Sequence, residues 1–309
     1  MKRFNFLAFA ALLLIAAACL PGCGGGASAT PTVRFLPSEA AAPGEAAPGA
    51  TAAPSTTEVV AGGMGTLKGK VVFQGEYKPL SPQYAKGAAP KDPAVCGAEA
   101  IPDESVIVSD GGLANVFVYL AKAPKGEFPA ASSEPVIFDQ KYCVFKPHAI
   151  IARTGQIVKI LNSDGVLHNT HTYPQRNTSF NQGIQPNDQT GIDLKYTKPE
   201  TKPLMVGCDV HPWMKAYHLP VDHPFAAVTA ADGTFEIKDL PSGKHDFKVW
   251  HEKGGELQKS LSVTIKPNET TEIEIPVAAA QLARFEGPSP QTIQLSFNEA
   301  PKATIQIPK

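Results

Sequence analysis

The chain has 309 residues, which is enough for two modest domains, each with a core of its own. Its 28 Lys and Arg nearly balance 29 Asp and Glu, for a formal net charge of −1, and they form no basic stripe, which argues against nucleic acid as a partner. Proline and glycine, with 29 and 26 residues, exceed their usual combined share of about 12%, which predicts short strands joined by many turns.

The N-terminus is typical of an exported protein. Lys2 and Arg3 precede an apolar stretch, residues 4–20, that is too short to span a bilayer as a permanent helix, so residues 1–23 are predicted to be a signal peptide. The run LPGC ending at Cys23 resembles the lipobox of bacterial lipoproteins, which implies a lipid on Cys23 and a place on the periplasmic side of the cell envelope. The alternative is an ordinary cleaved signal that discards both Cys19 and Cys23.

Residues 24–64 consist mainly of Ala, Pro, Ser, Thr and Gly and offer almost nothing to bury. Such a segment cannot offset its own ordering entropy. We expect it to be a semi-extended tether that holds the folded part away from a membrane surface.

The mature chain alternates apolar and polar residues in short runs, and no helical periodicity extends beyond one or two turns, so we expect an all-β protein. A hairpin is predicted around the turn at 110–112, residues 76–104 with their five prolines are predicted to be a long surface loop, and residues 279–309 have no assigned place. The predicted strands cover residues 67–73, 106–108, 116–120, 144–152, 157–161, 192–196, 204–207, 225–228, 234–237, 245–250, 261–265 and 271–277.

Two motifs carry candidate metal ligands. Cys208, His211 and Met214 are spaced three residues apart, and His168 lies forty residues earlier. A thiolate, two imidazoles and a weak axial thioether form the donor set of a type 1 copper site, which suits Cu(I) and Cu(II) about equally. Spacing alone does not separate His171 from His168, and the alternative is a buried Cys208 with histidines on surface loops.

These two motifs, in this order, resemble those of the cupredoxins of the amicyanin and plastocyanin type. The resemblance implies a Greek-key β-sandwich over residues 130–222, with one copper ion held by the four donor residues named above. It also implies that Asn169 forms a hydrogen bond near the thiolate, while His171 stays outside the ligand set. Trp213 would belong to an apolar patch around an exposed edge of His211, through which exported redox proteins would dock transiently.

The remaining cysteines, Cys96 and Cys143, are expected to form a disulfide in an oxidising compartment. The rival interpretation is a second metal site built from Cys143 and His148, which lie five residues apart.

A second resemblance concerns the flanking segments. The DG-x-F run at 232–235 and the LP-x-G run at 240–243 resemble the carboxypeptidase-regulatory or transthyretin-like β-sandwich, whose first strands would be residues 65–73 and 114–120. The cupredoxin domain would then interrupt a sandwich formed by residues 65–129 and 223–278, which compact domains tolerate because their termini often lie close together. The alternative is that residues 65–129 join the sheets of the copper domain.

The sequence favours electron transfer over catalysis. A site with four protein donors leaves no position for a substrate, and the sequence has no H-x-H series, no C-x-x-C-H haem motif and no second cysteine in the ligand loop. We therefore predict a membrane-tethered electron carrier that is not an enzyme. The alternatives are a copper carrier or buffer, and a binding module for carbohydrate or an envelope protein with a structural metal site.

Overall fold

The structure is a computed structural model that describes residues 59–126 and 128–282. The predicted signal peptide with Cys23, residues 24–58 of the tether and residues 283–309 lie outside the described residues. The protein is all-β, as predicted, and the two helices of the described part are single turns, α1 (Pro93–Cys96) and α2 (Ala279–Leu282). Across the same residues, none of the helices has the length and apolar character needed to cross a membrane.

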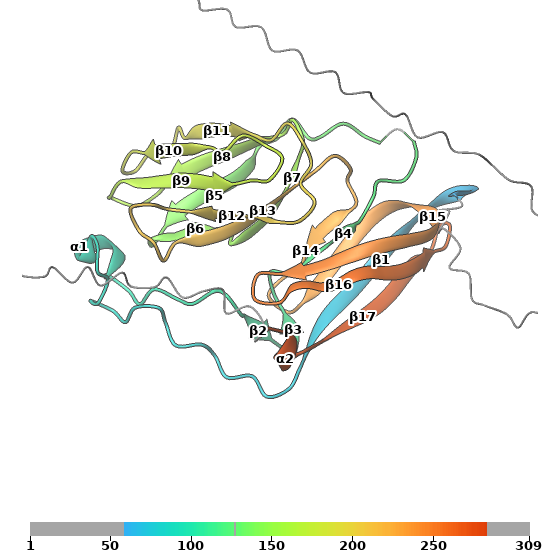
Figure 1. Ribbon diagram of the computed structural model, residues 1–309, viewed down its shortest axis with the longest axis horizontal. Helices are drawn as coiled ribbons and strands as arrows, with labels where there is room; N and C mark the ends of the chain where they lie inside the picture. The colour runs from blue at the N-terminus through green and yellow to red at the C-terminus, as the bar shows by residue number, and fades with distance from the viewer. Residues whose placement is uncertain (1–58, 127, 283–309) are drawn as a thin grey trace, which may run out of the picture. The chain divides into compact units, whose positions relative to one another are not determined.

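One eight-stranded sheet combines strands from both ends of the described chain (Figure 1). Its order is β14-β4-β15-β1-β3-β2, with β16 paired to β15 and β17 paired in parallel to β1. Its core includes Leu67 and Val118 from β1 and β4, near the start of the described chain, and Phe247 and Ile275 from β15 and β17, near its end. The strands are β1 (Val59–Gln74), β2 (Val108–Ser109), β3 (Gly112–Leu113), β4 (Phe117–Leu120), β14 (Ala226–Val228), β15 (Thr234–His251), β16 (Gly255–Ile265) and β17 (Thr270–Ala278).

The strands between β4 and β14 form two further sheets, of order β10-β9-β12-β13-β7 and β11-β8-β5-β6. Their buried faces share a core that includes Phe138, Val158, Val206 and Ala216. The chain thus leaves the first sheet after β4 and returns at β14, so the alternative in which residues 65–129 supply strands to the inserted sheets is wrong. The inserted strands are β5 (Val136–Lys141), β6 (Val144–Lys146), β7 (Ala149–Arg153), β8 (Ile157–Asn162), β9 (His168–Tyr173), β10 (Asn181–Ile184), β11 (Ile192–Lys195), β12 (Leu204–Gly207) and β13 (Lys215–Val221).

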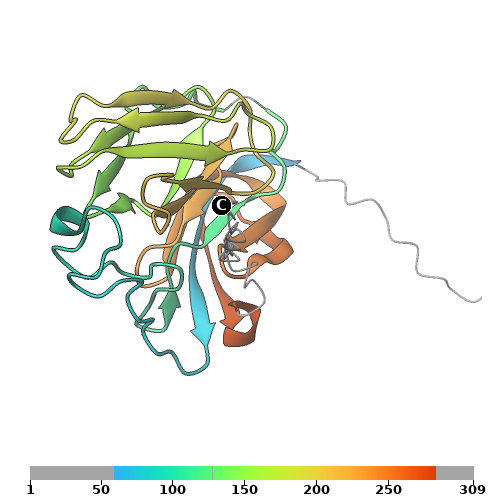
Figure 2. The same cartoon turned by 60° about the vertical axis from the view of Figure 1, so that its left-hand side comes forward.

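The predicted surface loop at 76–104 needs a correction. Its middle part, residues 84–101, which we call the strap, packs against the core of the inserted sheets through buried Ala89, Cys96 and Ile101 (Figure 2). A disulfide joins Cys96 to Cys143 at the β5–β6 turn. By its packing the strap therefore belongs to the inserted domain, and the predicted assignment of residues 65–129 to the other sandwich is wrong for this segment. The segment has many prolines and only a few apolar side chains that become buried, so its sequence has the composition of a surface loop.

Strand bounds and pairing also differ from the prediction in three places. A hairpin does form around the turn at 110–112, between β2 and β3, but residues 116–120 are not its second strand, since β4 pairs with β14 and β15. The predicted strand 144–152 is divided into β6 and β7, which lie in different sheets. Residues 234–250 form one continuous strand, β15, which changes its partner from β1 to β16 at Gly243.

Candidate metal centre

Two neighbouring antiparallel strands bring the predicted ligands together. His168 is the first residue of β9, and Cys208 follows the last residue of β12, which pairs with β9. The ligand loop closes on itself, because the Cys208 amide donates to the Met214 carbonyl at 3.3 Å and the Met214 amide donates to the His211 carbonyl at 2.9 Å. His211 is thereby turned back toward Cys208.

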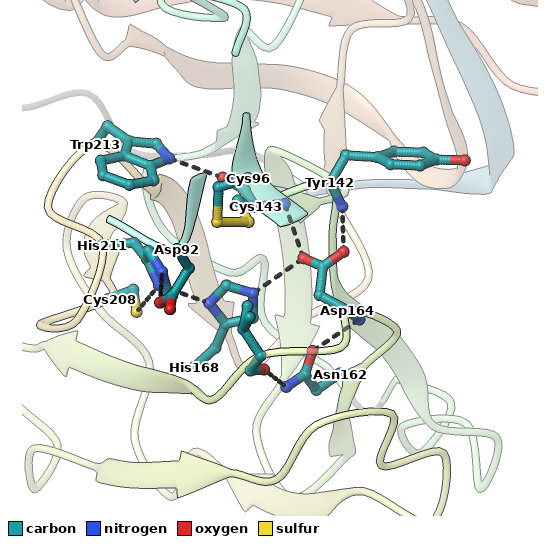
Figure 3. The surroundings of a disulfide bond; sticks show 11 residues. Asp92, Cys96, Tyr142, Cys143, Asn162, Asp164, His168, Cys208, His211 and Trp213 are labelled. Atoms are coloured by element: carbon teal, nitrogen blue, oxygen red, sulfur yellow. Dashed lines mark hydrogen bonds and ion pairs between the residues drawn. A yellow bond between two sulfur atoms is a disulfide. The ribbon is translucent and has the colours of Figure 1, made fainter. Parts of the chain in front are cut away.

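Three donor atoms converge at this point (Figure 3). His168 Nδ1 lies 2.9 Å from His211 Nδ1, and Cys208 Sγ lies 3.7 Å from His211 Nδ1. The three ligand atoms lie within 4.8 Å of one another, and all three side chains are buried. A sulfur and two ring nitrogens that face one small buried volume are a suitable donor set for a soft or borderline transition metal.

Hydrogen bonds favour the thiolate form of Cys208. Burial by itself raises the pKa of the thiol, but hydrogen bonds from His168 and His211 and from backbone amides outweigh it and lower the pKa to about 6. Burial likewise opposes the charge on His168, yet the Asp164 carboxylate and the Cys208 thiolate raise the pKa of this imidazole. The cavity therefore favours a positive charge next to the sulfur, which a bound cation would also provide.

Each imidazole is held from behind by a carboxylate. His168 Nε2 donates to Asp164 Oδ2 and His211 Nε2 donates to Asp92 Oδ2, both at 2.9 Å (Figure 3). Such partners fix the tautomer that leaves Nδ1 free for a metal, and they make the imidazole a better donor. Neither carboxylate was predicted from the sequence. Asp164 lies only four residues before His168 and could have been noticed, whereas Asp92 is 119 residues from His211 and has no local signal.

Asn169 links the two ligand segments. Its backbone amide faces Cys208 Sγ at 3.5 Å, and its side-chain oxygen lies 3.3 Å from the same sulfur and accepts from the Asp209 amide at 2.7 Å. Its amide nitrogen donates to the side chains of Asn181 and Asp209. This geometry fits the role that the cupredoxin resemblance implies for Asn169.

His171 and Met214 are placed differently from the three donors. His171 lies outside the donor group, and its Nδ1 contacts the Asp209 carboxylate at 3.1 Å and the Tyr173 hydroxyl at 3.0 Å. Met214 is buried in the same core cluster as Cys208 and Trp213. Its thioether as an axial ligand stays a prediction.

The predicted exposed edge of His211 is wrong. The His211 side chain is fully buried, since Asp92 of the strap occupies its outer nitrogen. Trp213 is 5% exposed, donates its indole N–H to the Cys143 carbonyl at 3.0 Å and packs edge-on against Tyr84 of the strap. The strap therefore covers the region where the sequence predicted an apolar docking patch.

The rival metal site at Cys143 also fails. Cys143 forms the disulfide with Cys96, so its sulfur is not a thiolate, which also rules out the second cluster of Cys143, Asp164 and His168. His148 instead lies between Glu252, 2.5 Å from Nε2, and Glu104, 3.7 Å from Nδ1. Burial opposes the charge on this imidazole, but the two carboxylates raise its pKa to about 9.

Comparisons with known proteins give only distant matches. No family model matches the sequence, and no curated protein does. Solved structures that are similar to part of the chain include three from different proteins. They are a Cu-containing nitrite reductase from Thermus scotoductus SA-01 (19% identity, TM-score 0.27), a purple cupredoxin from Nitrosopumilus maritimus (15%, 0.24) and an amicyanin from Paracoccus versutus (11%, 0.25).

The matches cover 33%, 28% and 38% of this chain, respectively. The chain spans a quarter of the reductase, 99% of the purple cupredoxin and 98% of the amicyanin.

Proposed function

We propose that the protein binds one copper ion through Cys208, His168 and His211, with Met214 as a weak fourth donor, and carries single electrons in the cell envelope. The observation that supports this most directly is the convergence of three buried donor atoms within 4.8 Å of one another. One thiolate and two imidazoles suit both copper oxidation states, whereas Mg²⁺ and Ca²⁺ require oxygen donors.

The residues around the donors suit electron transfer because they resist movement. Bound copper would supply a one-electron couple between Cu(I) and Cu(II). Asp164 and Asp92 hold the two imidazoles from behind, and Asn169 fixes the segment that carries Cys208. Donors that keep their places in both oxidation states reduce the reorganisation that accompanies each transfer.

A copper carrier would use the same ligands, so the two functions must be separated by other features. A carrier has to release its ion to a partner, and the donors here are buried beneath a strap that is covalently tied to the inserted domain. This burial favours a retained ion. We further propose that the N-terminal segment anchors the protein through Cys23 on the periplasmic side of the envelope, where exported redox proteins would be its partners.

The experiment compares the absorption spectra of wild type and of cysteine and histidine variants, each purified as the full chain and loaded with one equivalent of Cu(II). We expect an intense thiolate-to-copper absorption band and a reversible redox couple in voltammetry. The band should disappear in Cys208→Ser and in His168→Gln, and it should persist in the matched control His171→Gln. Tight binding of Cu(I) alone without a reversible couple would instead identify a carrier, and an unchanged band in Cys208→Ser would disprove the proposed site.

A further inference from the structure

The turn between β5 and β6 presents an exposed aromatic and cationic surface close to the metal centre. Tyr142 is 60% exposed, and its ring points away from the disulfide (Figure 3). The ammonium groups of Lys141 and Lys146 lie 5.4 and 4.9 Å from the centroid of this ring. Ile137, 48% exposed, lies on the same outward face of β5 as Lys141, because side chains alternate along a strand. We call these four residues the Tyr142 patch.

The turn is held in an unfavourable backbone conformation. Tyr142 and Cys143 have φ angles of 59° and 53°, which residues with a side chain rarely adopt. Such a conformation persists only where the surroundings enforce it. The disulfide fixes Cys143, and the two amides of the turn donate to one carboxylate, that of Asp164, at 2.7 and 2.8 Å.

That carboxylate is the same one that holds His168. Asp164 Oδ2 accepts from His168 Nε2 at 2.9 Å, and Asp164 Oδ1 accepts from the Tyr142 amide at 2.7 Å. A single side chain therefore bridges a predicted metal ligand and the main chain of an exposed tyrosine. A path made of covalent bonds and short hydrogen bonds also couples an electron donor to its acceptor more strongly than a path of the same length that includes a jump through space.

The other imidazole is also buried behind a carboxylate. His211 is fully buried, and its Nε2 bonds Asp92 of the strap, whose side chain is 33% exposed. A partner protein would have to displace a segment that is tied down by a disulfide before it could reach this ring. The route through His168 and Asp164 differs in that it ends at an exposed aromatic and cationic surface, that of Tyr142, Lys141 and Lys146.

We propose that the Tyr142 patch is the docking surface for a one-electron redox protein with an acidic surface, and that the electron crosses Asp164 between this surface and His168. The charge of Lys141 and Lys146 specifies an acidic partner, because complementary charges steer association and fix the docked orientation. In each transfer the partner loses one electron and Cu(II) becomes Cu(I), or the reverse. This inference rests on the proposed function.

The test uses small oxidants of opposite charge on the Cu(I) form of the full chain. Hexacyanoferrate(III), an anion, takes one electron and becomes hexacyanoferrate(II), while the cation tris(phenanthroline)cobalt(III) becomes the cobalt(II) complex. We compare the wild type with the Lys141→Glu/Lys146→Glu variant by stopped-flow spectroscopy. The matched control, Lys238→Glu/Lys266→Glu, reverses two exposed lysines, one in β15 and one directly after β16.

We expect the anionic oxidant to react about tenfold or more slowly with the patch variant at low ionic strength, and the cationic oxidant to react faster. The difference should shrink at about 1 M salt, where the screening length falls to about 3 Å. A rate with hexacyanoferrate(III) that stays within twofold of wild type, or that falls equally in the control, would overturn the docking surface.

A second measurement does not depend on copper. In the metal-free protein, paramagnetic hexacyanochromate(III) should broaden the NMR signals of the Tyr142 and Cys143 amides more than those around Tyr173, which is exposed elsewhere on the inserted domain. Selective broadening at Tyr173 would overturn the proposal. Failure of the proposed function itself would appear separately, as the absence of the absorption band and of the redox couple.

Discussion

Replacement of Asp164 by Asn tests whether one carboxylate holds both the metal ligand and the β5–β6 turn. The carboxylate accepts three hydrogen bonds, from the amides of Tyr142 and Cys143 and from His168 Nε2. Asn has almost the same shape but only one acceptor oxygen, so at least one of these bonds is lost and an amide N–H then faces another donor. A hydrogen bond to a charged group contributes about 1.5–3 kcal/mol, so we expect Asp164→Asn to lower the free energy of unfolding by about 2–3 kcal/mol.

The assay is urea unfolding of the metal-free protein with its disulfide intact, followed by tryptophan fluorescence in a Trp250→Phe background, so that the signal comes from Trp213, whose indole bonds the Cys143 carbonyl beside the turn. The matched control is Asp193→Asn, since Asp193 is 51% exposed and pairs with Lys159 at the surface. Its effect should stay below about 1 kcal/mol. A loss of less than about 0.5 kcal/mol for Asp164→Asn would refute the bridging role of this carboxylate.

Three further predictions concern stability. The pKa of His148 is raised from 6.5 to about 9, so its charged form stabilises the fold by about 3 kcal/mol. This contribution is complete below pH 6.5 and is lost as the pH rises through 9. The urea midpoint should therefore fall across that pH range in wild type but not in His148→Gln. Gly112→Ala should lower the free energy of unfolding by about 3 kcal/mol through overpacking, because an added Cβ would lie 1.7 Å from the Asp232 carbonyl oxygen. The control, Gly165→Ala, adds a Cβ in open space and should change the free energy of unfolding by less than about 0.5 kcal/mol. Equal effects of the two substitutions would contradict the packing argument. Replacement of Cys96 and Cys143 by Ala should lower the free energy of unfolding by about 4 kcal/mol, because the disulfide closes a loop of 47 residues and so restricts the unfolded chain. A melting temperature equal to that of wild type would contradict this prediction.

The sequence points to a candidate donor set because much of its arrangement is local. The short spacing from Cys208 to Met214 fits one closed loop, and His168 begins the strand that pairs with the strand before Cys208. Alternation of apolar residues likewise predicts most strands, among them β8, β12 and β17. Patterns of this kind depend on neighbours in the chain, which a single sequence displays directly.

The sequence does not reveal contacts between distant segments. Asp92 bonds His211 from 119 residues away, and its surroundings of proline and small residues give the appearance of a loop. The strap consequently hides the imidazole that was expected to be exposed. Pairing between β4 and β15 is missed for the same reason, because the partner of a short strand is decided by tertiary packing and not by the strand's own pattern.

The most direct test of the account is the copper X-ray absorption spectrum of the purified full chain with one equivalent of copper, in both oxidation states. We expect one short sulfur and two imidazole nitrogens per copper, with little change in their distances on reduction, since Asp164, Asp92 and Asn169 hold the donor groups in place. In Cys208→Ser the sulfur contribution at short distance should vanish. A spectrum of wild type with only oxygen and nitrogen neighbours would contradict the central claim that Cys208, His168 and His211 bind the same ion.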